Sequence, residues 1–348
     1  MNSSLSDGGS EKALLLVAQS LVERGHDVTM ALVRNKPRTY KADSRIRIIQ
    51  FEYGRASKVL MLWHRMRQLR LLSDQEKFDY VVCYMWDLNV MTLMATLGLD
   101  TKVVVSERAY PGAKSRRSYT RLLERLFYRG AHKIIYQTNG ARKYCPAELT
   151  DKSFVVPNII EDLELSNPTG KRERRIVSIG RLDTQKNFPL LLNSFAEFHR
   201  VNNEWTLEIY GQGPLEQSLK SLTSKLGIED FVHFRGYVSD IPEQIRNAGM
   251  FVLTSDFEGI SNAMTEAMAA GIPTICTDCP VGGASLMIEN GKSGILVPVG
   301  KQDEIVAAMN RIAHDSELAS NLSIGAIQSV RRFTPAKMSV LWEDEVLK

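Results

Sequence analysis

The sequence predicts an α/β protein built from two doubly wound domains. Its 348 residues exceed the size of a usual single core and suit two domains of ordinary size. Short β-rich apolar runs alternate with longer segments of helical periodicity, which is the pattern of βαβ units and parallel sheets. A charged stretch with Pro157, Pro168 and Gly170, residues 156–174, divides the chain and is interpreted as the linker.

The predicted strands form two series, one on each side of this linker. The first series comprises Val28–Val33, Ile46–Phe51, Tyr80–Tyr84, Lys102–Ser106 and Lys133–Gln137. The second comprises Arg175–Gly180, Thr206–Tyr210, Val232–Gly236, Met250–Thr254 and Pro273–Thr277. We therefore expect an N-terminal domain over residues 1–160, a C-terminal domain over 161–325, and a final helix over 326–348 that packs back on the first domain.

The beginning of the chain departs from this plan. A doubly wound domain normally opens with an apolar strand before its first glycine turn. Here the turn Asp7-Gly8-Gly9-Ser10 comes almost at once. We expect either a stub strand over Met1–Leu5 or a first strand that lies upstream.

Composition indicates an ordinary globular protein of a reducing compartment. Apolar residues make up 44% and charged residues 24%, and the net charge of +4 is modest. The few scattered cysteines do not suit a disulfide framework, and the polar N-terminus lacks a secretory signal. The apolar window Tyr80–Leu99 carries Asp87 and Asn89, so it is predicted as a buried strand and helix rather than a membrane span. We expect a cytoplasmic protein with no nucleic-acid partner.

The most informative segment is residues 255–273, which follows one predicted strand and precedes the next. Glu258 lies in its loop, and Glu266 lies about one turn into a helix that Ser261 or Asn262 can cap. A helix N-terminus offers unpaired N–H groups and a positive dipole end to a diphosphate, while carboxylates accept from sugar hydroxyls. For this segment alone, an ordinary helix start with acidic residues is the alternative.

A second segment, Ile176–Asn187, leaves a strand through Gly180 and carries Arg181 and Lys186 before the next helix. Two cations beside a helix N-terminus form an anion clamp, with a solvated loop as the alternative. Both segments follow the carboxyl end of a predicted parallel strand, where open α/β sheets bind ligands. We therefore interpret them together as one binding site.

Other motifs are set aside. Cys276-x-x-Cys279 has no second pair and follows a buried strand, which argues against zinc or redox use. Gly211-x-Gly213 lacks the third glycine and the acidic residue of a nicotinamide site. His26 lies in a turn between a helix and a strand, where a structural role is favoured.

Taken together, these motifs resemble the group 1 retaining glycosyltransferases of the GT-B fold, which use nucleotide-sugar donors to build bacterial polysaccharides and glycolipids. The resemblance covers nearly the whole chain. It rests on several motifs in the family's order: Val155–Asn158, Gly180-Arg181, Lys186-Asn187, Tyr210–Pro214, Glu258 with Glu266, Thr277-Asp278 and Gly294–Pro298. It implies two Rossmann-like domains that face each other across a cleft.

The resemblance also implies roles for individual residues. Arg181 and Lys186 would bind the donor diphosphate and stabilise the leaving nucleotide, with Glu258 against the donor sugar. Glu266 would hold the ribose hydroxyls. Further donor contacts are implied for Gly8, Gly9, Gly180, Gly211, Tyr237, Gly259, Ile260, Ser261 and Asn262. No metal and no other cofactor is implied, because the two cations and a helix dipole offset the charge of the donor.

One departure from the family concerns the strand end Val105–Pro111. Many relatives carry a histidine there, close to the donor sugar, whereas this chain has Glu107 and Arg108. The same Ser-Glu-Arg sequence occurs in some capsule and exopolysaccharide transferases, so we expect both residues on the acceptor side. A structural salt bridge at the strand end is the alternative.

Two basic segments suggest a membrane partner. Met61–Leu72 mixes arginines with Trp63 and leucines, and a second segment, residues 116–129, places Arg117, Arg121 and Arg125 at i, i+4 steps. Both are predicted as helices with a cationic face, which favours anionic lipid headgroups. A solvated helix face is the alternative for either segment alone.

The sequence thus favours a metal-independent retaining enzyme that moves a hexose or N-acetylhexosamine from a UDP-sugar to a growing lipid-linked glycan. Its expected partners are the nucleotide-sugar donor, the glycan acceptor and an anionic membrane, at the inner face of the plasma membrane. A nucleotide-sugar epimerase of the same fold is one alternative. A non-catalytic sugar-nucleotide-binding subunit of a polysaccharide assembly complex is the other.

Overall fold

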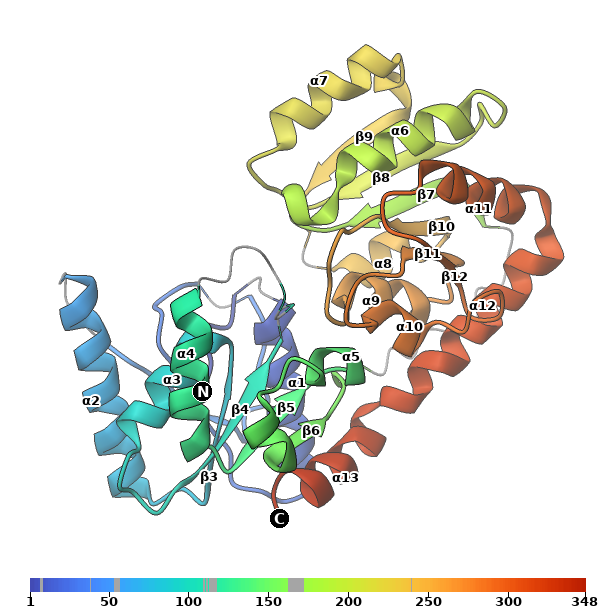
Figure 1. The fold of residues 1–348 in the computed structure, drawn as a ribbon. Helices are drawn as coiled ribbons and strands as arrows, with labels where there is room; N and C mark the ends of the chain where they lie inside the picture. Colours follow the sequence, from blue (N-terminus) through green and yellow to red (C-terminus); the bar gives the residue numbers. More distant parts are fainter. Residues whose placement is uncertain are drawn as a thin grey trace. The chain divides into compact units, whose positions relative to one another are not determined.

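The computed structural model describes residues 1–6, 9–37, 39–52, 57–108, 110, 112, 118–161, 172–238 and 240–348. The chain divides into two compact units (Figure 1). One unit comprises Met1–Glu161 with Phe333–Lys348, and the other comprises Asp162–Arg332. In both units the pairings between described strands are parallel and helices connect the strands, so the predicted α/β class is confirmed.

The first unit contains a two-stranded and a four-stranded parallel sheet. The smaller sheet pairs β1 (Thr29–Leu32) with β2 (Arg47–Gln50). The larger sheet has the order β3 (Tyr80–Tyr84), β4 (Lys102–Glu107), β5 (Lys133–Tyr136) and β6 (Ser153–Val155). The helices of this unit are α1 (Gly9–Glu23), α2 (Lys58–Glu76), α3 (Trp86–Ala95), α4 (Ser118–Phe127), α5 (Asn139–Arg142) and α13 (Pro335–Glu345).

The apolar window Tyr80–Leu99 forms β3 followed by α3, as the sequence predicts. Asn89 of α3 is buried, and its Nδ2 donates to the Ser106 carbonyl at 3.1 Å. This polar side chain therefore belongs to the protein core, where its hydrogen bond offsets the cost of burial. Within the described part of the chain, no helix combines the length and apolar character needed to span a bilayer.

A cavity of about 330 Å³ in the first unit is lined by residues of both β1 and β3, with apolar side chains of α1 and α2. Met1 also lines this cavity, and the first residues of the chain do not form the stub strand considered for Met1–Leu5. Asn2 makes one isolated bridge with Leu32, and the Met1 amino group donates to the Val82 carbonyl. Burial lowers the pKa of this amino group. Apart from such isolated contacts, the two sheets of the unit are separate.

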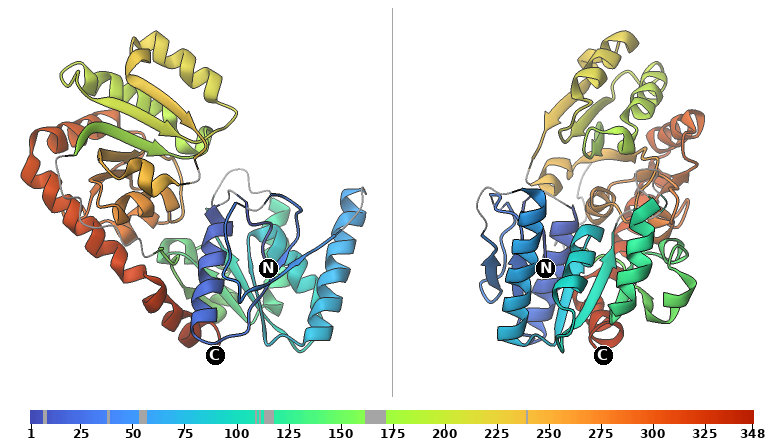
Figure 2. Two further views of the ribbon diagram at one scale, coloured as in Figure 1. Left: turned by 180° about the vertical axis from the view of Figure 1, so that it is seen from behind. Right: turned by 60° about the vertical axis from the view of Figure 1, so that its left-hand side comes forward.

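The C-terminal segment forms two helices instead of the single helix predicted over 326–348. The first, α12 (Ser316–Val330), belongs to the second unit, and α13 packs on α1 in the first unit (Figure 2). Glu343 of α13 accepts from the Arg24 guanidinium and lies 2.8 Å from His26 Nε2. His26 thus makes a structural contact between the turn after α1 and the C-terminal helix.

The second unit contains a six-stranded parallel sheet with the order β12-β11-β10-β7-β8-β9. Its strands are β7 (Glu173–Ile179), β8 (Thr206–Tyr210), β9 (Val232–Gly236), β10 (Ala248–Leu253), β11 (Thr274–Thr277) and β12 (Ile295–Val297). Besides α12, its helices are α6 (Phe188–His199), α7 (Glu216–Leu226), α8 (Ile241–Ile245), α9 (Asn262–Ala269), α10 (Gly283–Met287) and α11 (Gln302–His314). The sequence analysis missed β6 and β12, which are only three residues long.

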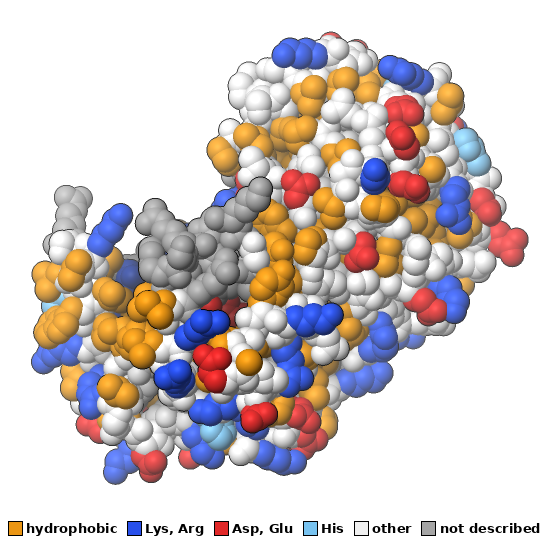
Figure 3. Space-filling model, viewed as in Figure 1, with side chains coloured by type: hydrophobic (Ala, Val, Ile, Leu, Met, Phe, Trp, Pro, Cys, Tyr) orange, Lys and Arg blue, Asp and Glu red, His pale blue; other side chains and the backbone are white. Residues whose placement is uncertain are grey.

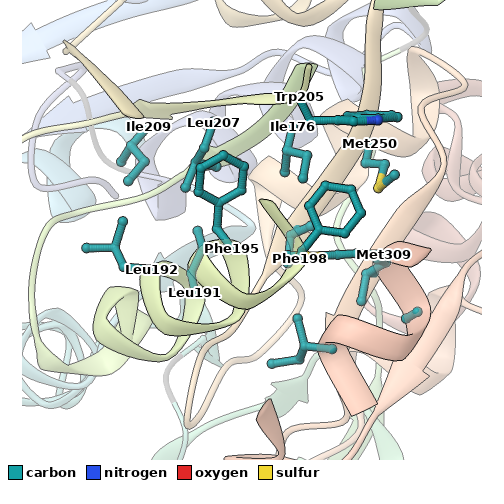
Figure 4. Packing of buried hydrophobic residues seen from close by; sticks show 14 of the residues in the cluster. Ile176, Leu191, Leu192, Phe195, Phe198, Trp205, Leu207, Ile209, Met250 and Met309 are labelled. Carbon is teal, nitrogen blue, oxygen red and sulfur yellow. The ribbon is translucent and has the colours of Figure 1, made fainter. Parts of the chain in front are cut away.

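The core of the second unit lies where α6 and α11 pack on the sheet. Phe195 and Phe198 of α6 are fully buried and point toward strand residues such as Ile176 and Leu207 (Figure 4). Every residue of β10 is buried, so both faces of the sheet centre are covered. Burial of one such large aromatic side chain contributes about 2–3 kcal/mol, which makes the sheet a rigid support for the loops at its edge.

The order of the strands creates a switch point between β7 and β10. From β7 the chain runs outward through β8 and β9, and it then returns to the other side of β7 through β10, β11 and β12. In open parallel sheets, the loops at the carboxyl ends of two such strands diverge and leave a crevice for a ligand. The loop after β7 and the loop after β10 therefore flank the expected ligand position.

The contact between α13 and α1 predicts a pH-dependent stability. Hydrogen bonds from Arg24 and then His26 lower the pKa of Glu343 from 4.5 to about 2. A carboxylate with a depressed folded-state pKa stabilises the protein above its unfolded-state pKa and loses this contribution as the pH falls through the folded value. Glu343→Gln should therefore lower the melting temperature at pH 7, and the difference from wild type should shrink between pH 4.5 and 2.

Asp344→Asn is the matched control, because Asp344 is the next residue and its ion pair is with Lys348 near the exposed end of α13. It should change the melting temperature little at either pH. A Glu343→Gln deficit that is equally large at pH 7 and at pH 2.5 would show that the carboxylate charge does not stabilise this contact.

Candidate active site

The loop that follows β7 carries two of the predicted cations. Arg181 follows the strand, and Lys186 ends a 3₁₀ turn over Thr184–Lys186. Asp183 caps this turn, since its Oδ1 accepts from the Gln185 N–H at 3.1 Å. Its Oδ2 accepts from Arg181 Nε at 2.8 Å, and the arginine side chain is 75% exposed. The loop therefore presents one exposed and one half-buried cation.

Hydrogen bonds join this loop to the loop that follows β10. Thr254 Oγ1 lies 3.1 Å from the carbonyl oxygens of both Lys186 and Asn187. Asn187 Nδ2 donates to Asp256 Oδ1 at 2.8 Å, and the Asp256 N–H donates to the Gln185 carbonyl at 2.9 Å. These contacts hold the two loops in one arrangement at the switch point.

Lys186 and Glu258 form an ion pair between these loops. Their side chains are only 14% and 15% exposed. The buried Ser255 hydroxyl donates to the same Glu258 Oε1 at 3.1 Å, which fixes the carboxylate from its own loop. A Cβ at Gly180 would lie 2.8 Å from Lys186 Cε, so the glycine leaves room for the lysine stem. The structure thus brings together two residues that are 72 positions apart in the sequence.

The helix α9 begins directly after Glu258 and its loop. Ser261 is the N-cap, and its side chain accepts from the Met264 N–H at 3.4 Å. Residues 259–262, for which backbone contacts were predicted, therefore form the entry to the helix. Glu266 lies in the middle of α9 and is half-buried. The positive end of the α9 dipole thus lies beside the Glu258 loop.

Close backbone contacts explain the glycines at the ends of β7 and β8. Gly211 has φ of +132°, and a Cβ on it would lie 2.0 Å from the Gly180 carbonyl oxygen. Its N–H donates to the Gly236 carbonyl at 2.7 Å. Tyr237 follows Gly236 at the end of β9, and its side chain is 44% exposed. The ends of β7 and β8 therefore approach each other through backbone atoms at Gly180 and Gly211.

Glu107 lies at the end of β4 in the first unit and is buried. It accepts a hydrogen bond from the Tyr128 hydroxyl, and Asn89 Nδ2 donates to its Oε1 at 3.3 Å. Burial and then the nearby Glu107 charge raise the pKa of Tyr128 well above its ordinary value. Tyr128 therefore stays protonated and donates to the carboxylate at neutral pH.

Arg108 follows Glu107 and contacts different partners, because successive residues of a strand point to opposite faces. Its Nη1 donates to Asn158 Oδ1 at 2.6 Å, and its guanidinium carbon lies 4.0 Å from the centroid of the Tyr84 ring. Burial lowers the pKa of this arginine. The two residues thus make separate contacts at the strand end.

The predicted glycine loop at the N-terminus lies partly outside the described residues, since Gly8 is not among them and Gly9 opens α1. The sequence analysis missed Glu11, which is buried in the first turn of α1. Its carboxylate accepts from Ser4 Oγ at 2.6 Å and from the Ser6 N–H at 3.0 Å. The run of serines just before a helix that has a glutamate in its first turn was the available signal.

In the second unit, the sequence analysis missed the side chains that hold the two loops, namely Asp183, Asn187, Ser255 and Asp256. The signal was their position beside predicted site residues in both segments. Cys276 and Cys279 are buried and form no disulfide with each other, and burial raises the pKa of the Cys279 thiol to about 11. No group of metal-ligating side chains that could hold an ion occurs among the described residues.

The arrangement in the second unit combines two cations, two carboxylates and a helix N-terminus at the carboxyl edge of one sheet. Cations and a helix N-terminus bind anions such as a diphosphate, and carboxylates accept from hydroxyl groups. A molecule that carries a diphosphate beside a polyhydroxyl group matches both features. The site therefore fits a nucleotide sugar.

Solved structures with the same fold come from the GT-B class of glycosyltransferases. Anabaena Alr3699/HepE in complex with UDP-glucose matches with a TM-score of 0.79 at 16% identity, covering 99% of this chain and 97% of that one. The lipopolysaccharide outer core galactosyltransferase WaaB matches with a TM-score of 0.74 at 20% identity, covering 99% and 98%. The chain therefore has the GT-B fold, with two Rossmann-like units.

The sequence defines the family within this class. Residues 160–329 match the family described as Glycosyl transferases group 1, and residues 8–158 match the Glycosyl transferase 4-like domain. The amylovoran biosynthesis glycosyltransferase AmsD of Erwinia amylovora is 22% identical, with 97% of this chain and 95% of that protein covered. The chain belongs to the group 1 glycosyltransferase family.

A Campylobacter jejuni relative is 24% identical, with 97% of this chain and 94% of that protein covered. It is named as the GalNAc-alpha-(1->4)-GalNAc-alpha-(1->3)-diNAcBac-PP-undecaprenol alpha-1,4-N-acetyl-D-galactosaminyltransferase. This relative therefore acts on a glycan linked to undecaprenol through a diphosphate.

The close approach of Gly211 to Gly180 predicts a strong effect of adding one methyl group. Gly211→Ala combines a backbone with positive φ and a clash of 2.0 Å with a backbone oxygen. Urea unfolding should show a loss of at least about 2 kcal/mol in unfolding free energy.

Gly227→Ala is the matched control, because Gly227 has φ of +67° but no atom within 4 Å of the added Cβ. It should cost about 1 kcal/mol from backbone strain alone. Equal losses for the two variants would mean that the approach of Gly211 to Gly180 is not what requires the glycine.

Proposed function

We propose that this enzyme transfers a hexose or N-acetylhexosamine from a UDP-sugar to a growing lipid-linked glycan, with retention at the anomeric carbon, in surface polysaccharide biosynthesis. The observation that carries the proposal is the pairing of Lys186 with Glu258 at the switch point of the second sheet. This pairing supports the proposal because a cation can bind a diphosphate and a carboxylate can accept from sugar hydroxyls.

The relatives support the finer parts of this proposal. HepE has been solved with UDP-glucose, and the C. jejuni relative is named for a diphospho-undecaprenol acceptor. The E. amylovora relative is named for amylovoran biosynthesis. A UDP-sugar and a lipid-linked glycan therefore agree with the chemistry of proteins that match nearly the whole chain.

In the proposed reaction, Arg181 and Lys186 bind the diphosphate and stabilise the charge that grows on it as the glycosidic bond breaks. Glu258 contacts the donor sugar, and Glu266 holds the ribose hydroxyls. The acceptor hydroxyl attacks from the face that the diphosphate leaves, and its proton passes to the leaving phosphate oxygen. The protein supplies no separate base and needs no metal ion, because the cations and the α9 dipole offset the charge.

The remaining predicted residues have supporting roles in this proposal. Tyr237 borders the nucleotide base of the donor. Glu107 and Arg108 lie on the acceptor-binding side of the enzyme. In the second unit, backbone groups contact the sugar and phosphates at Gly180, Gly211, Gly259, Ile260, Ser261 and Asn262.

The proposal predicts how three variants behave in a transfer assay. Lys186→Ala and Arg181→Ala should each lower kcat about 10²–10³-fold, since both cations act on charge that develops in the transition state. Glu266→Ala should mainly raise KM for the donor, because a ribose contact already exists in the ground state. The assay uses a panel of UDP-, GDP- and ADP-sugars with saturating acceptor, and NMR of the product gives its anomeric configuration.

Thermal melting of each variant serves as the control for folding. If both cation variants keep near-normal kcat while folded, the diphosphate clamp is wrong. Turnover of the donor without any acceptor would point to an epimerase, and donor binding without turnover would point to a binding subunit. Transfer only from GDP- or ADP-sugars would contradict the proposal that the donor nucleotide is UDP.

We also propose that the first unit docks on an anionic membrane through α2 and α4. On α2, Val59 is 79% and Trp63 is 54% exposed, and the Arg67 guanidinium lies 5.9 Å from the Trp63 ring centroid. On α4, Leu122 and Leu126 are 67% and 58% exposed. Exposed apolar side chains next to arginines suit the interface between lipid headgroups and acyl chains.

The surface over α2 carries apolar side chains with basic ones between them (Figure 3). Not every arginine of the predicted cationic faces is available to lipid. Arg70 donates to the carbonyls of Ala95 and Leu97 and so caps the end of α3. Arg117 lies outside the described residues, as does the side chain of Arg121; among the described side chains of α4, Arg125 is basic and exposed.

Vesicle sedimentation tests this docking surface. The protein should bind vesicles that contain phosphatidylglycerol more tightly than phosphatidylcholine vesicles, and salt should weaken the binding. Reversing two charges with Arg67→Glu and Arg125→Glu should lower binding at least about tenfold, since each basic residue near the surface contributes about 1 kcal/mol.

Lys225→Glu on α7 is the control, because it makes the same charge change as each single reversal, at an exposed position of the other unit. It should leave vesicle binding unchanged. Equal binding to both vesicle types, or an equal loss for Lys225→Glu, would contradict docking through α2 and α4.

A further inference from the structure

Both cations of the diphosphate clamp already have carboxylate partners in this structure. Arg181 pairs with Asp183 and Lys186 pairs with Glu258. The four formal charges sum to zero, so a diphosphate must compete with carboxylates for each cation. The two competitions differ in strength, because the Arg181 side chain is 75% exposed and the Lys186 side chain is 14% exposed. Solvent screens the first pair and screens the second much less.

The competition at Lys186 places two anions near one ammonium group. If Glu258 stays on Lys186 while the diphosphate binds, the carboxylate repels the phosphate oxygens at short range in a half-buried site. If Glu258 moves away, it loses the lysine and keeps the Ser255 hydroxyl as its partner. Either outcome costs free energy when the ligand is a bare diphosphate.

A sugar attached to the diphosphate changes this balance. Sugar hydroxyls are hydrogen-bond donors, and the Glu258 carboxylate accepts from such groups. A nucleotide sugar can therefore replace the lysine contact that Glu258 loses, whereas a bare nucleoside diphosphate cannot.

We propose that Glu258 is a specificity-determining residue that makes the site favour an intact nucleotide sugar over the nucleoside diphosphate left after transfer. The inference rests on the proposed function of the site and adds a role for the ion pair seen without ligand. Once the sugar has moved to the acceptor, Glu258 loses its hydroxyl partners and competes again for Lys186. This competition lowers the affinity of the site for the nucleoside diphosphate product.

The loops that carry the pair allow this exchange to be tested without unfolding the site. The backbone near Lys186 is held by Thr254 and by the contact of Asn187 with Asp256, and neither contact involves Glu258. Glu258→Gln keeps the size of the side chain and an oxygen that can accept from Ser255. It removes the negative charge that competes with the diphosphate and replaces the other acceptor oxygen by an NH2 group.

Titration calorimetry with UDP, inorganic pyrophosphate, UDP-glucose and UDP-N-acetylglucosamine tests the inference on the full-length chain. Glu258→Gln should bind UDP and pyrophosphate about three- to tenfold more tightly than wild type, the range expected for removing a half-buried competing charge. Its affinity for the UDP-sugar that the wild type prefers should not rise, so the preference for the sugar over UDP should fall by the same factor or more.

Asp183→Asn is the matched control. It removes one negative charge from the same loop and keeps the oxygen that caps the Gln185 N–H, but its partner is the exposed cation. Its affinity for UDP should change less than about twofold. An equal gain in both variants would mean that general charge, and not competition at Lys186, sets the affinity, and this result would overturn the inference.

The pyrophosphate arm separates failure of the inference from failure of the proposed function. A folded Glu258→Gln that binds neither UDP nor pyrophosphate more tightly than wild type overturns the inference, even when the wild type transfers sugar normally. Tighter pyrophosphate binding in a protein with no affinity for any UDP compound supports the exchange at Lys186 and contradicts the UDP-sugar donor. Absence of binding in every arm overturns both.

Discussion

The site depends on the hydrogen bonds that tie the loop after β7 to the loop after β10. Thr254 contacts two successive carbonyls of the first loop, and Asn187 contacts Asp256 of the second. These bonds arise because the strand order puts β7 and β10 side by side although 68 residues separate β7 from β10. Without them, Lys186 and Glu258 would lie on two independent loops, and the cation and carboxylate would not meet in one geometry.

The residues around this pair support the loops that carry the reactive side chains. Asp183 and Ser261 cap the turns at which each loop meets a helix, and the glycines at the strand ends keep side chains away from the sheet edge. The side chains of Asp183 and Ser261 act through these caps, whereas the backbone of Ser261 and of the glycines faces the proposed donor site. They hold the reactive side chains within the small tolerance that positioning and electrostatic stabilisation require. The buried core beneath the sheet gives this frame its rigidity.

Much of the second unit could be predicted from the sequence because its signals are local. Alternation of strands and helices fixed the class, and the segments around Lys186 and Glu258 each carried a strand end, a loop and a helix start. The pairing of Lys186 with Glu258 could not be predicted, since it depends on which strands become neighbours. The buried Glu11 was missed for a similar reason, as its partners are serines outside regular structure. The short β6 and β12 lack the length that makes periodicity visible.

The cavity between β1 and β3 has a consequence for the cooperativity of the first unit. Backbone hydrogen bonds transmit order along a continuous sheet, and here the small sheet of β1 and β2 is separate from the sheet of β3 to β6. The smaller sheet is tied to the rest of the unit by side-chain packing on α1, by the contacts of Met1 and Asn2 and by the ion pair of Arg47 with Glu76 of α2. Such a segment is expected to open at a lower free energy than the global unfolding of the unit. The free energy of local unfolding is therefore expected to be lower around β1 and β2 than around the sheet of β3 to β6. The second of these sheets has Glu107 and Arg108 at the end of β4.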